Sequence, residues 1–326
     1  MVPPSVLQPV RRRRRRRPPL VPLAFLALTA VVALFFVLRH RGNDTAQPAP
    51  PHATATKAHA KPTPAVAQRL VARHPGALSH QRLEPPLGAR AAIVVDDGSG
   101  RVIWAANRNR RLPIASTTKI MTAHLVLERL SLNRVITIDN GVTRVPLVKE
   151  GLRPGERVAV WKLLDGLLLF SGNDDAYALS IAAGGSRANF VRMMNEEAKR
   201  LGLHHTHFRS PSGVIDKDNY STAADLATIT RAAMRDPRFR NIVKQRLARV
   251  AWRAPTFSKI YVNKNRLLGR YRGANGVKTG WTTKAGHCLV ASATRDGRTL
   301  IAVVLGSPRP YNDAARLLNL GFRVAS

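Results

Sequence analysis

Three different patterns of apolar and polar residues follow one another along the chain. Residues 18–38 carry no charge and form one continuous apolar run. Residues 42–86 are rich in Ala, Pro, Thr and His and hold few large apolar side chains. From about residue 87 onward, strand-like runs and helix-like periodicities alternate, as in a domain with its own core. The pattern predicts an apolar segment, a linker and one folded domain.

The apolar run has the length of a membrane-spanning helix. As a helix, residues 20–38 would be about 28 Å long, close to the thickness of a bilayer core. Seven consecutive arginines at residues 11–17 outnumber Arg39 and Arg41 behind the run, so we expect the N-terminus in the cytoplasm. No small-residue cleavage site follows. We therefore expect an uncleaved signal-anchor at residues 20–38, with residues 1–19 cytoplasmic, rather than a cleaved signal peptide.

Residues 39–86 are predicted to be a disordered linker, because they have too few apolar residues to form a core. As a coil they would reach about 40 Å. The remaining residues, 87–326, would then be a single domain held away from the cytoplasmic membrane on its extracytoplasmic, or periplasmic, side.

The folded region has strands at both ends and helices between them. Residues 91–107 read as a hairpin, and residues 274–283 and 286–306 read as further strands, with a turn at Asp296 and Gly297. Helices are predicted from Ser116, over 160–170, from a Ser186 cap to Gly202, from Ser221, and over 312–322. The fold class is therefore α+β, with one antiparallel sheet formed by both ends of the domain and helices packed on its faces.

Composition narrows the choice of partners. The formal net charge is +34, and from Leu87 onward there are 39 basic and 17 acidic residues. Such a surface favours nucleic acid, anionic lipid or a polymer that carries carboxylates. No zinc-finger spacing, aromatic RNA-binding motif or basic heptad pattern occurs, so we expect no nucleic-acid partner. The lone Cys288 permits no internal disulfide and is expected to be a buried small apolar residue.

Three short motifs occur in order along the domain: "STTK" at 116–119, "SGN" at 171–173 and "KTG" at 278–280. Ser116 and Lys119 would share one helix face, since a helical turn holds 3.6 residues. Each motif alone is weak, but in this order they are the signature of penicillin-binding proteins and class A β-lactamases.

From about residue 87 to the C-terminus, the chain resembles the serine D-alanyl-D-alanine carboxypeptidases, the low-molecular-mass penicillin-binding proteins. The flanking stretches "LPIASTTKIMTA", "LLLFSGNDDAYALS", "THFRSPSGV" and "GVKTGWTTKAGHCLVASAT" are similar to segments of that family. The resemblance implies a β-lactamase-like transpeptidase fold, peptidoglycan stem peptides as substrate and β-lactams as covalent inhibitors. Nothing in it implies a cofactor.

Chemistry gives each motif residue a role. Ser116 would attack the carbonyl of a D-Ala-D-Ala bond, with Lys119 as its base. The base must be neutral, and three effects would lower its pKa: burial in a cleft, the positive end of its own helix, and the second cation Lys278. Ser171 could relay the proton to the leaving D-alanine, and Asn173 could hold the substrate amide.

The third motif would bind the substrate. An edge strand that carries it can pair with an extended peptide, and Gly280 permits close approach. Lys278 and Thr279 would contact the terminal carboxylate, and an arginine that the sequence does not identify could add to this recognition. By resemblance, the oxyanion hole consists of the backbone N–H groups of Ser116 and Trp281.

Two other groups of polar residues invite functional interpretations. His204, His205 and His207 lack an H-E-x-x-H motif and a cysteine partner, so we expect no metal site there. Asp174 and Asp175 follow the second motif, and we expect them to stabilise the start of the next helix rather than to act as acid or base.

Carboxypeptidase activity is the expected function, and three alternatives remain. A D,D-endopeptidase would use the same residues on cross-links, and only 46 residues follow Gly280, too few for the extra C-terminal β-domain of larger carboxypeptidases. A β-lactamase would need a deacylating glutamate, and none is convincing between Ser171 and Lys278. A non-catalytic cell-wall binder would use the basic surface, but the intact motifs favour an enzyme.

Overall fold

The computed structural model describes residues 86–214, 218–252 and 257–324. The predicted cytoplasmic segment, membrane helix and nearly all of the predicted linker lie outside these ranges. Within them, no helix combines the length and the hydropathy that a membrane crossing requires.

A five-stranded antiparallel sheet forms the centre of the domain, in the order β2-β1-β9-β8-β7. Its N-terminal hairpin comprises β1 (Ala91–Asp96) and β2 (Val102–Ala106), and the C-terminal strands are β7 (Ala274–Thr282), β8 (Gly286–Arg295) and β9 (Arg298–Ser307). The prediction of one sheet from both ends of the domain is confirmed. Strand β7, which carries the third motif, is an edge strand.

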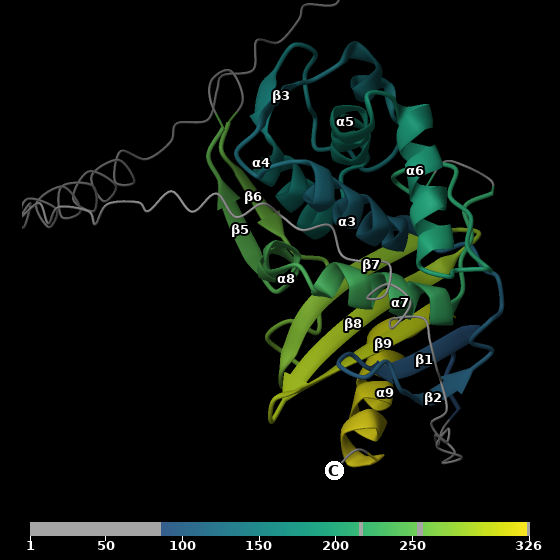
Figure 1. Cartoon of the computed structure of the whole chain (residues 1–326). Coiled ribbons are helices and arrows are strands. Elements are labelled where there is room, and N and C mark those ends of the chain that lie inside the picture. Colours follow the sequence, from purple (N-terminus) through teal and green to yellow (C-terminus); the bar gives the residue numbers. More distant parts are fainter. Residues whose placement is uncertain (1–85, 215–217, 253–256, 325–326) are drawn as a thin grey trace, which may run out of the picture. The chain divides into compact units, whose positions relative to one another are not determined.

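Strand alternation sends side chains into two apolar layers. Ile93 and Val303 belong to the core shared with the helical region, whereas Val94 and Val304 belong to a second core. Helix α9 (Pro310–Val324) covers this second core through residues such as Leu317. Figure 1 shows α9 against one face of the sheet and α7 (Ala223–Met234) with α8 (Pro237–Val243) against the other.

The β8–β9 turn lies where the sequence predicts it. Asp296 and Gly297 both adopt positive φ, +49° and +74°, as a two-residue type I′ hairpin turn requires. Arg295 pairs with Arg298 across this turn, so the turn fixes the register of the two strands.

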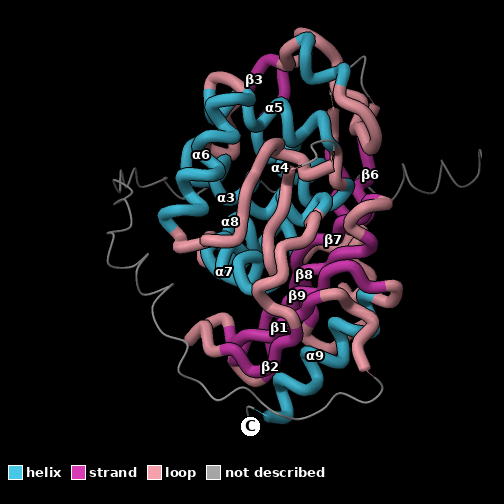
Figure 2. The backbone as a smooth tube through the Cα atoms, turned by 90° about the vertical axis from the view of Figure 1, so that its right-hand side faces the viewer, coloured by secondary structure: helices cyan, strands magenta, loops and turns pink. Residues whose placement is uncertain are grey.

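The other helices gather in a second region, above the sheet in the view of Figure 2. Its helices are α3 (Lys119–Arg129), α4 (Val160–Asp165), α5 (Asn173–Gly184) and α6 (Arg187–Arg200). Ser186 caps α6 as predicted, with its Oγ accepting from the Asn189 N–H at 3.1 Å. Helix α7 is capped by Thr222 and not by Ser221, because the Ser221 hydroxyl is paired with Thr206.

Short elements depart from the sequence-based expectations. Residues 160–170 are not one α-helix: α4 is followed by the π-helix η3 (Gly166–Phe170). The 3₁₀ helix η1 (Ala115–Thr118) precedes α3, so Ser116 lies before the α-helix and not in it. The sequence did not predict the 3₁₀ helix η2 (Asn140–Arg144). It also did not predict two two-stranded ribbons, β3 (Val135–Thr137) with β4 (Arg157–Ala159) and β5 (Leu247–Val250) with β6 (Lys259–Val262). Elements this short leave little periodicity in a sequence.

Candidate active site

Ser116 is held at a tight bend between the sheet and the helical region. Ala115, directly before it, adopts φ +48° although it is not glycine. A left-handed residue of this kind is strained and persists only where the surrounding structure imposes it. One turn later, Lys119 begins α3, and its Nζ lies 2.9 Å from Ser116 Oγ. The predicted serine–lysine contact is present in the structure.

Lys119 is fully buried and is surrounded by oxygen atoms. Besides Ser116 Oγ, its Nζ contacts Asn173 Oδ1 at 2.8 Å and the Ser212 carbonyl oxygen at 3.3 Å. Burial lowers the pKa of the amine to about 7, and the positive charge of Lys264 acts in the same direction. A pKa this close to neutrality makes the neutral amine accessible at pH 7, and a neutral amine can accept the proton of the Ser116 hydroxyl.

Ser171 lies in the turn between η3 and α5, and Asn173 is the first residue of α5. Both polar atoms of the Asn173 amide form hydrogen bonds within the protein. Its Oδ1 accepts from Lys119, and its Nδ2 donates to the Pro146 carbonyl oxygen at 3.1 Å. In this arrangement Asn173 orients Lys119. Ser171 adopts φ +75° at the end of the π-helix and, although largely buried, lines the same cleft as Ser116.

The edge strand β7 passes directly beside the nucleophile. A Cβ on Gly280 would lie only 2.9 Å from Ser116 N and 3.1 Å from Ala115 Cβ, so glycine is needed for this approach. Lys278 is buried, and its Nζ donates to the Thr279 carbonyl oxygen at 3.1 Å. Burial, together with the charges of Lys119 and Lys264, lowers the pKa of Lys278 well below its usual value.

A cleft of about 750 Å³ opens over these residues. Five of the eight predicted site residues line it: Ser116, Ser171, Thr279, Gly280 and Trp281. The other three, Lys119, Asn173 and Lys278, are buried behind its wall. The structure thus brings the three motifs together, with the nucleophile at the surface of the cleft and the amines beneath it.

Sequence reasoning missed two basic residues of the cleft, Lys264 and Arg266. They belong to "NKNR" at 263–266, which matches no motif and is separated from the "KTG" strand by a loop. The Lys264 ammonium lies 4.9 Å from the centre of the Phe170 ring. A concentration of basic residues shortly before the third motif was the available signal, but the sequence alone does not show which of them reach the cleft.

Asp174 has a structural role that includes a neighbouring loop. Its Oδ1 accepts from the Glu150 N–H and its Oδ2 from the Gly151 N–H, each at 2.8 Å, and the Leu152 N–H lies 3.1 Å from Oδ2. Asp174 is in the first turn of α5, where the sequence predicted a stabilising carboxylate. The same side chain therefore also fixes the loop that precedes β4.

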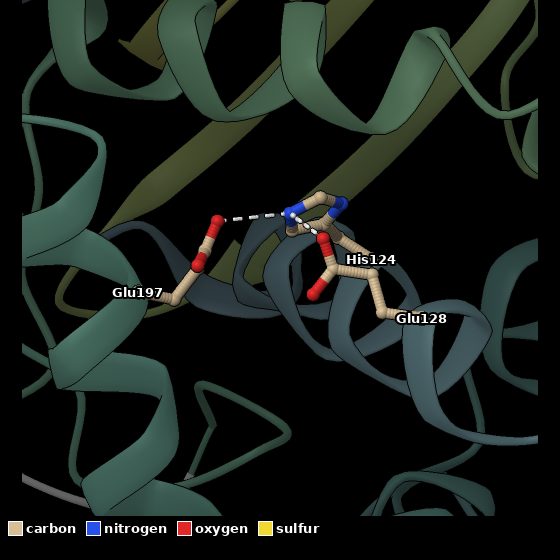
Figure 3. Close-up of side chains that lie close together, drawn as sticks. All are labelled: His124, Glu128 and Glu197. Atoms are coloured by element: carbon tan, nitrogen blue, oxygen red, sulfur yellow. Dashed lines mark hydrogen bonds and ion pairs between the residues drawn. The ribbon is translucent and has the colours of Figure 1, made fainter. Parts of the chain in front are cut away.

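One further cluster of side chains has atoms of the kind that bind metals. His124, Glu128 and Glu197 place their ligand atoms within 4.8 Å of one another between α3 and α6 (Figure 3). Arg200 also reaches this cluster, donating from Nε to Glu197 Oε2 and from Nη2 to Glu197 Oε1, each at 2.6 Å. A cation of the chain itself thus balances the buried carboxylate, and the cluster joins the two helices as an ion-pair network.

Cys288 is buried on β8, as expected for a small apolar residue. Burial raises the pKa of its thiol to about 11, so the reactive thiolate is scarce at neutral pH. Of these two side chains, Ser116 is therefore the favoured nucleophile, because its hydroxyl contacts a base, Lys119.

Comparisons with known proteins agree with this geometry. Residues 79–309 match the model of the D-alanyl-D-alanine carboxypeptidase family. The chain is 38% identical to the D-alanyl-D-alanine carboxypeptidase of Streptomyces sp. strain K15, over 73% of this chain and 89% of that protein. It is 36% identical to DacC of Escherichia coli, over 73% of this chain but only 62% of the relative.

Solved structures give the same result. The chain is similar to the Streptomyces K15 DD-transpeptidase, with a TM-score of 0.70, 36% identity and coverage of 74% of this chain and all of that one. A penicillin-binding protein homologue from Mycobacterium tuberculosis gives a TM-score of 0.71 at 35% identity, over 76% of this chain and 97% of the other. With its motifs gathered in one cleft and its family match over residues 79–309, the chain belongs to the serine D-alanyl-D-alanine carboxypeptidase family.

Proposed function

We propose that this enzyme removes the terminal D-alanine from peptidoglycan stem peptides through an acyl-enzyme on Ser116. The observation that carries the proposal is the 2.9 Å contact between Ser116 Oγ and the buried Lys119 Nζ, at the wall of a cleft that an edge strand borders. An extended peptide can add to such an edge through its backbone. The match to carboxypeptidases supports the same assignment.

The chemical steps follow from these positions. Ser116 Oγ forms a bond to the penultimate D-alanine carbonyl carbon while its proton passes to neutral Lys119. The C–N bond then breaks, and Lys119, directly or through Ser171, returns the proton to the leaving D-alanine nitrogen. Water hydrolyses the resulting ester. The backbone N–H groups of Ser116 and Trp281 would stabilise the oxyanion.

The substrate's terminal carboxylate would bind at the cationic end of the cleft. Thr279 lines the cleft, Lys278 is buried behind it, and Lys264 and Arg266 also line it. A bound carboxylate favours the charged form of a nearby amine. Substrate binding would therefore protonate Lys278, while Lys119 remains available as the base.

Labelling with a fluorescent penicillin followed by peptide mapping tests the nucleophile. A β-lactam carbonyl stands in for the D-Ala-D-Ala carbonyl, so the label should be found on Ser116 and should be absent from Ser116→Ala. Incubation of the protein with purified muropeptides should release D-alanine from pentapeptides. A label on another residue would remove Ser116 from this role.

A second function with the same acyl-enzyme is transfer to an amine or cleavage of cross-links. The Streptomyces K15 protein is named a D-alanyl-D-alanine carboxypeptidase as a sequence relative and a DD-transpeptidase as a solved structure. The two activities differ in whether water or an amine accepts the acyl group. A mixture of pentapeptide and cross-linked dimer separates carboxypeptidase from endopeptidase activity. Dimers split to monomers while pentapeptide stays intact would establish the endopeptidase instead.

We also propose that the domain acts outside the cytoplasmic membrane, tethered by residues 20–38. The apolar run, the arginines before it and the linker composition support this arrangement. The substrate class supports it as well, because cross-linked peptidoglycan is extracytoplasmic.

A further inference from the structure

A pair of buried carboxyl groups lies where α5 and the loop before β4 meet the π-helix η3. Asp175, on α5, is fully buried, and the side chain of Glu150, from the loop before β4, is 1% exposed. Both approach Gly166: a Cβ there would lie 2.3 Å from Glu150 Oε2 and 2.6 Å from Asp175 Oδ2. The two carboxyl groups therefore meet at the start of the π-helix η3.

These facing oxygen atoms need a proton between them. Within the described residues, no N–H or O–H group donates to Glu150 Oε2 or to either carboxyl oxygen of Asp175. Two ionised carboxylates in contact inside a protein would repel each other strongly, whereas a carboxyl group donates one hydrogen bond to a carboxylate. Burial and the adjacent Glu150 raise the pKa of Asp175 well above its usual value.

The surroundings decide which member carries the proton. Glu150 Oε1 accepts from Lys259 Nζ at 2.9 Å and from the Tyr261 hydroxyl. Both donors stabilise a carboxylate at Glu150, so the proton belongs on Asp175. Titratable groups act on the pair from each neighbouring element, namely Lys259 and Tyr261 on β6, Asp174 on α5, Asp165 on α4 and Lys119 on α3.

Asp175 also acts on the proposed base. Its negative charge, when present, is the strongest charge effect that raises the pKa of Lys119, ahead of Asp174, whereas Lys264 opposes them. Glu150 is not among the charges acting on Lys119. A negative charge on Asp175 would therefore hold a proton on the lysine, and a charge on Glu150 would do so far less.

We propose that Glu150 and Asp175 share a single proton, carried by Asp175, and that this arrangement keeps negative charge away from Lys119 so that it serves as a base at neutral pH. Both acids are positioning residues, because they act through Lys119 and touch no substrate. The proposal deepens the proposed acylation mechanism and rests on Lys119 as its base.

The pH dependence of penicillin acylation, measured on the full-length chain, tests the proposal. In the wild type the rate should rise as Lys119 loses its proton, with a midpoint at or below about pH 7, because the pKa of about 7 includes the raising effect of an ionised Asp175. Asp175→Asn removes no charge if Asp175 is protonated, so this midpoint should stay within about 0.3 pH unit. Glu150→Gln removes the neighbouring charge and places an amide N–H group beside Asp175, because the amide oxygen would keep the Lys259 and Tyr261 donors. Asp175 should then ionise more readily and raise the midpoint by up to about one unit.

The double variant and a control complete the design. Glu150→Gln with Asp175→Asn should return the midpoint to the wild-type value or below, because no charge of the pair is left. Glu196→Gln makes the same chemical change at a side chain that is 55% exposed on α6 and should leave the midpoint unchanged. A midpoint about one unit lower in Asp175→Asn would show an ionised Asp175 and overturn the proposal.

Infrared spectroscopy gives a readout that does not depend on catalysis. At pH 7 the wild type should show the C=O stretch of a protonated buried carboxyl group, and Asp175→Asn should lack it. No such band in the wild type would refute the shared proton, even if a variant failed to fold. Failure of the acylation mechanism itself would appear differently, as an unlabelled Ser116 with the band still present.

Discussion

At the scale of single residues, Lys119 has the environment that most directly determines reactivity. An amine in water keeps its proton at pH 7, but burial lowers the pKa of Lys119 to about 7. The unfolded chain would bind the proton up to pH 10.5, so this side chain lowers folding stability at neutral pH, and stability should rise as the pH increases from about 7 towards 10.5. The burial that makes Lys119 a neutral base therefore also lowers the stability of the fold at pH 7.

Lys119→Ala should therefore abolish acylation without unfolding the domain. Loss of a general base reduces rates by about 10²–10⁴-fold. The substitution removes a buried amine whose desolvation lowers stability, which offsets the lost packing of its methylene groups. Stopped-flow acylation with a fluorescent penicillin gives the rate, and a thermal melt confirms folding. A mutant that is acylated at the normal rate would exclude Lys119 as the base.

At the scale of elements, the approach of β7 to η1 fixes the geometry of the cleft. Gly280→Ala would place a Cβ 2.9 Å from Ser116 N, so either the strand or the nucleophile must move. A displacement of about 1 Å can reduce an enzymatic rate by about 10²-fold. We expect acylation to fall by about tenfold to a hundredfold, measured as the second-order rate with penicillin.

A matched control for this substitution is Gly98→Ala in the β1–β2 turn. Its Cβ would be 3.4 Å from Asp96 Oδ1, an ordinary contact, and Gly98 has no positive φ. This variant should be acylated like the wild type. If Gly280→Ala were equally active, the close contact between strand and nucleophile would not govern catalysis.

The ion-pair network between α3 and α6 belongs to the same scale. Burial works to raise the pKa of Glu197, but hydrogen bonds from His124 and Arg200 outweigh it and lower this pKa below 4.5. A depressed carboxyl pKa stabilises the fold above the unfolded-state value, and this contribution is lost as the pH falls through the folded-state value. Stability should therefore decrease below about pH 4.5.

Glu197→Gln should lower the free energy of unfolding at pH 7 by about 1–3 kcal/mol, because Arg200 and His124 lose a charged acceptor. The variant should also lose part of its acid dependence. Urea unfolding at pH 7 and at pH 4 measures both effects. The exposed pair Arg192–Glu196 offers a comparison, since Glu196→Gln should change stability by less than about 1 kcal/mol. Equal losses in the two variants would contradict the assigned role of Glu197.

At the scale of the whole molecule, the proposed tether makes an independent prediction. If residues 20–38 form an uncleaved anchor, the mature protein keeps the arginines at 11–17 and sediments with membranes through high-salt washing. Salt removes proteins held by charge, which matters for a chain of net charge +34. Recovery of a soluble form whose N-terminus lies within residues 39–86 would show cleavage instead.

The sequence by itself determined much of the active site, because catalysis depends on residue types at short spacings. A serine and a lysine one turn apart are in contact whether the segment is 3₁₀ or α, so their pairing follows from local geometry. Continuous apolar runs bounded by turn residues likewise predicted the strands of the sheet, because a strand covered on both faces has apolar side chains in succession. The order of the three motifs then indicated the family.

Only the tertiary structure decided which groups surround the catalytic lysine. Lys119 Nζ donates to Asn173, which is 54 residues away in the sequence, and to the Ser212 carbonyl oxygen, which is 93 residues away. No local sequence pattern encodes such contacts. The same holds for Lys264 in the cleft and for the meeting of Glu150 with Asp175. A pKa depends on burial and on charges brought together by folding, so the sequence could name the base, but only the packing around it sets its protonation.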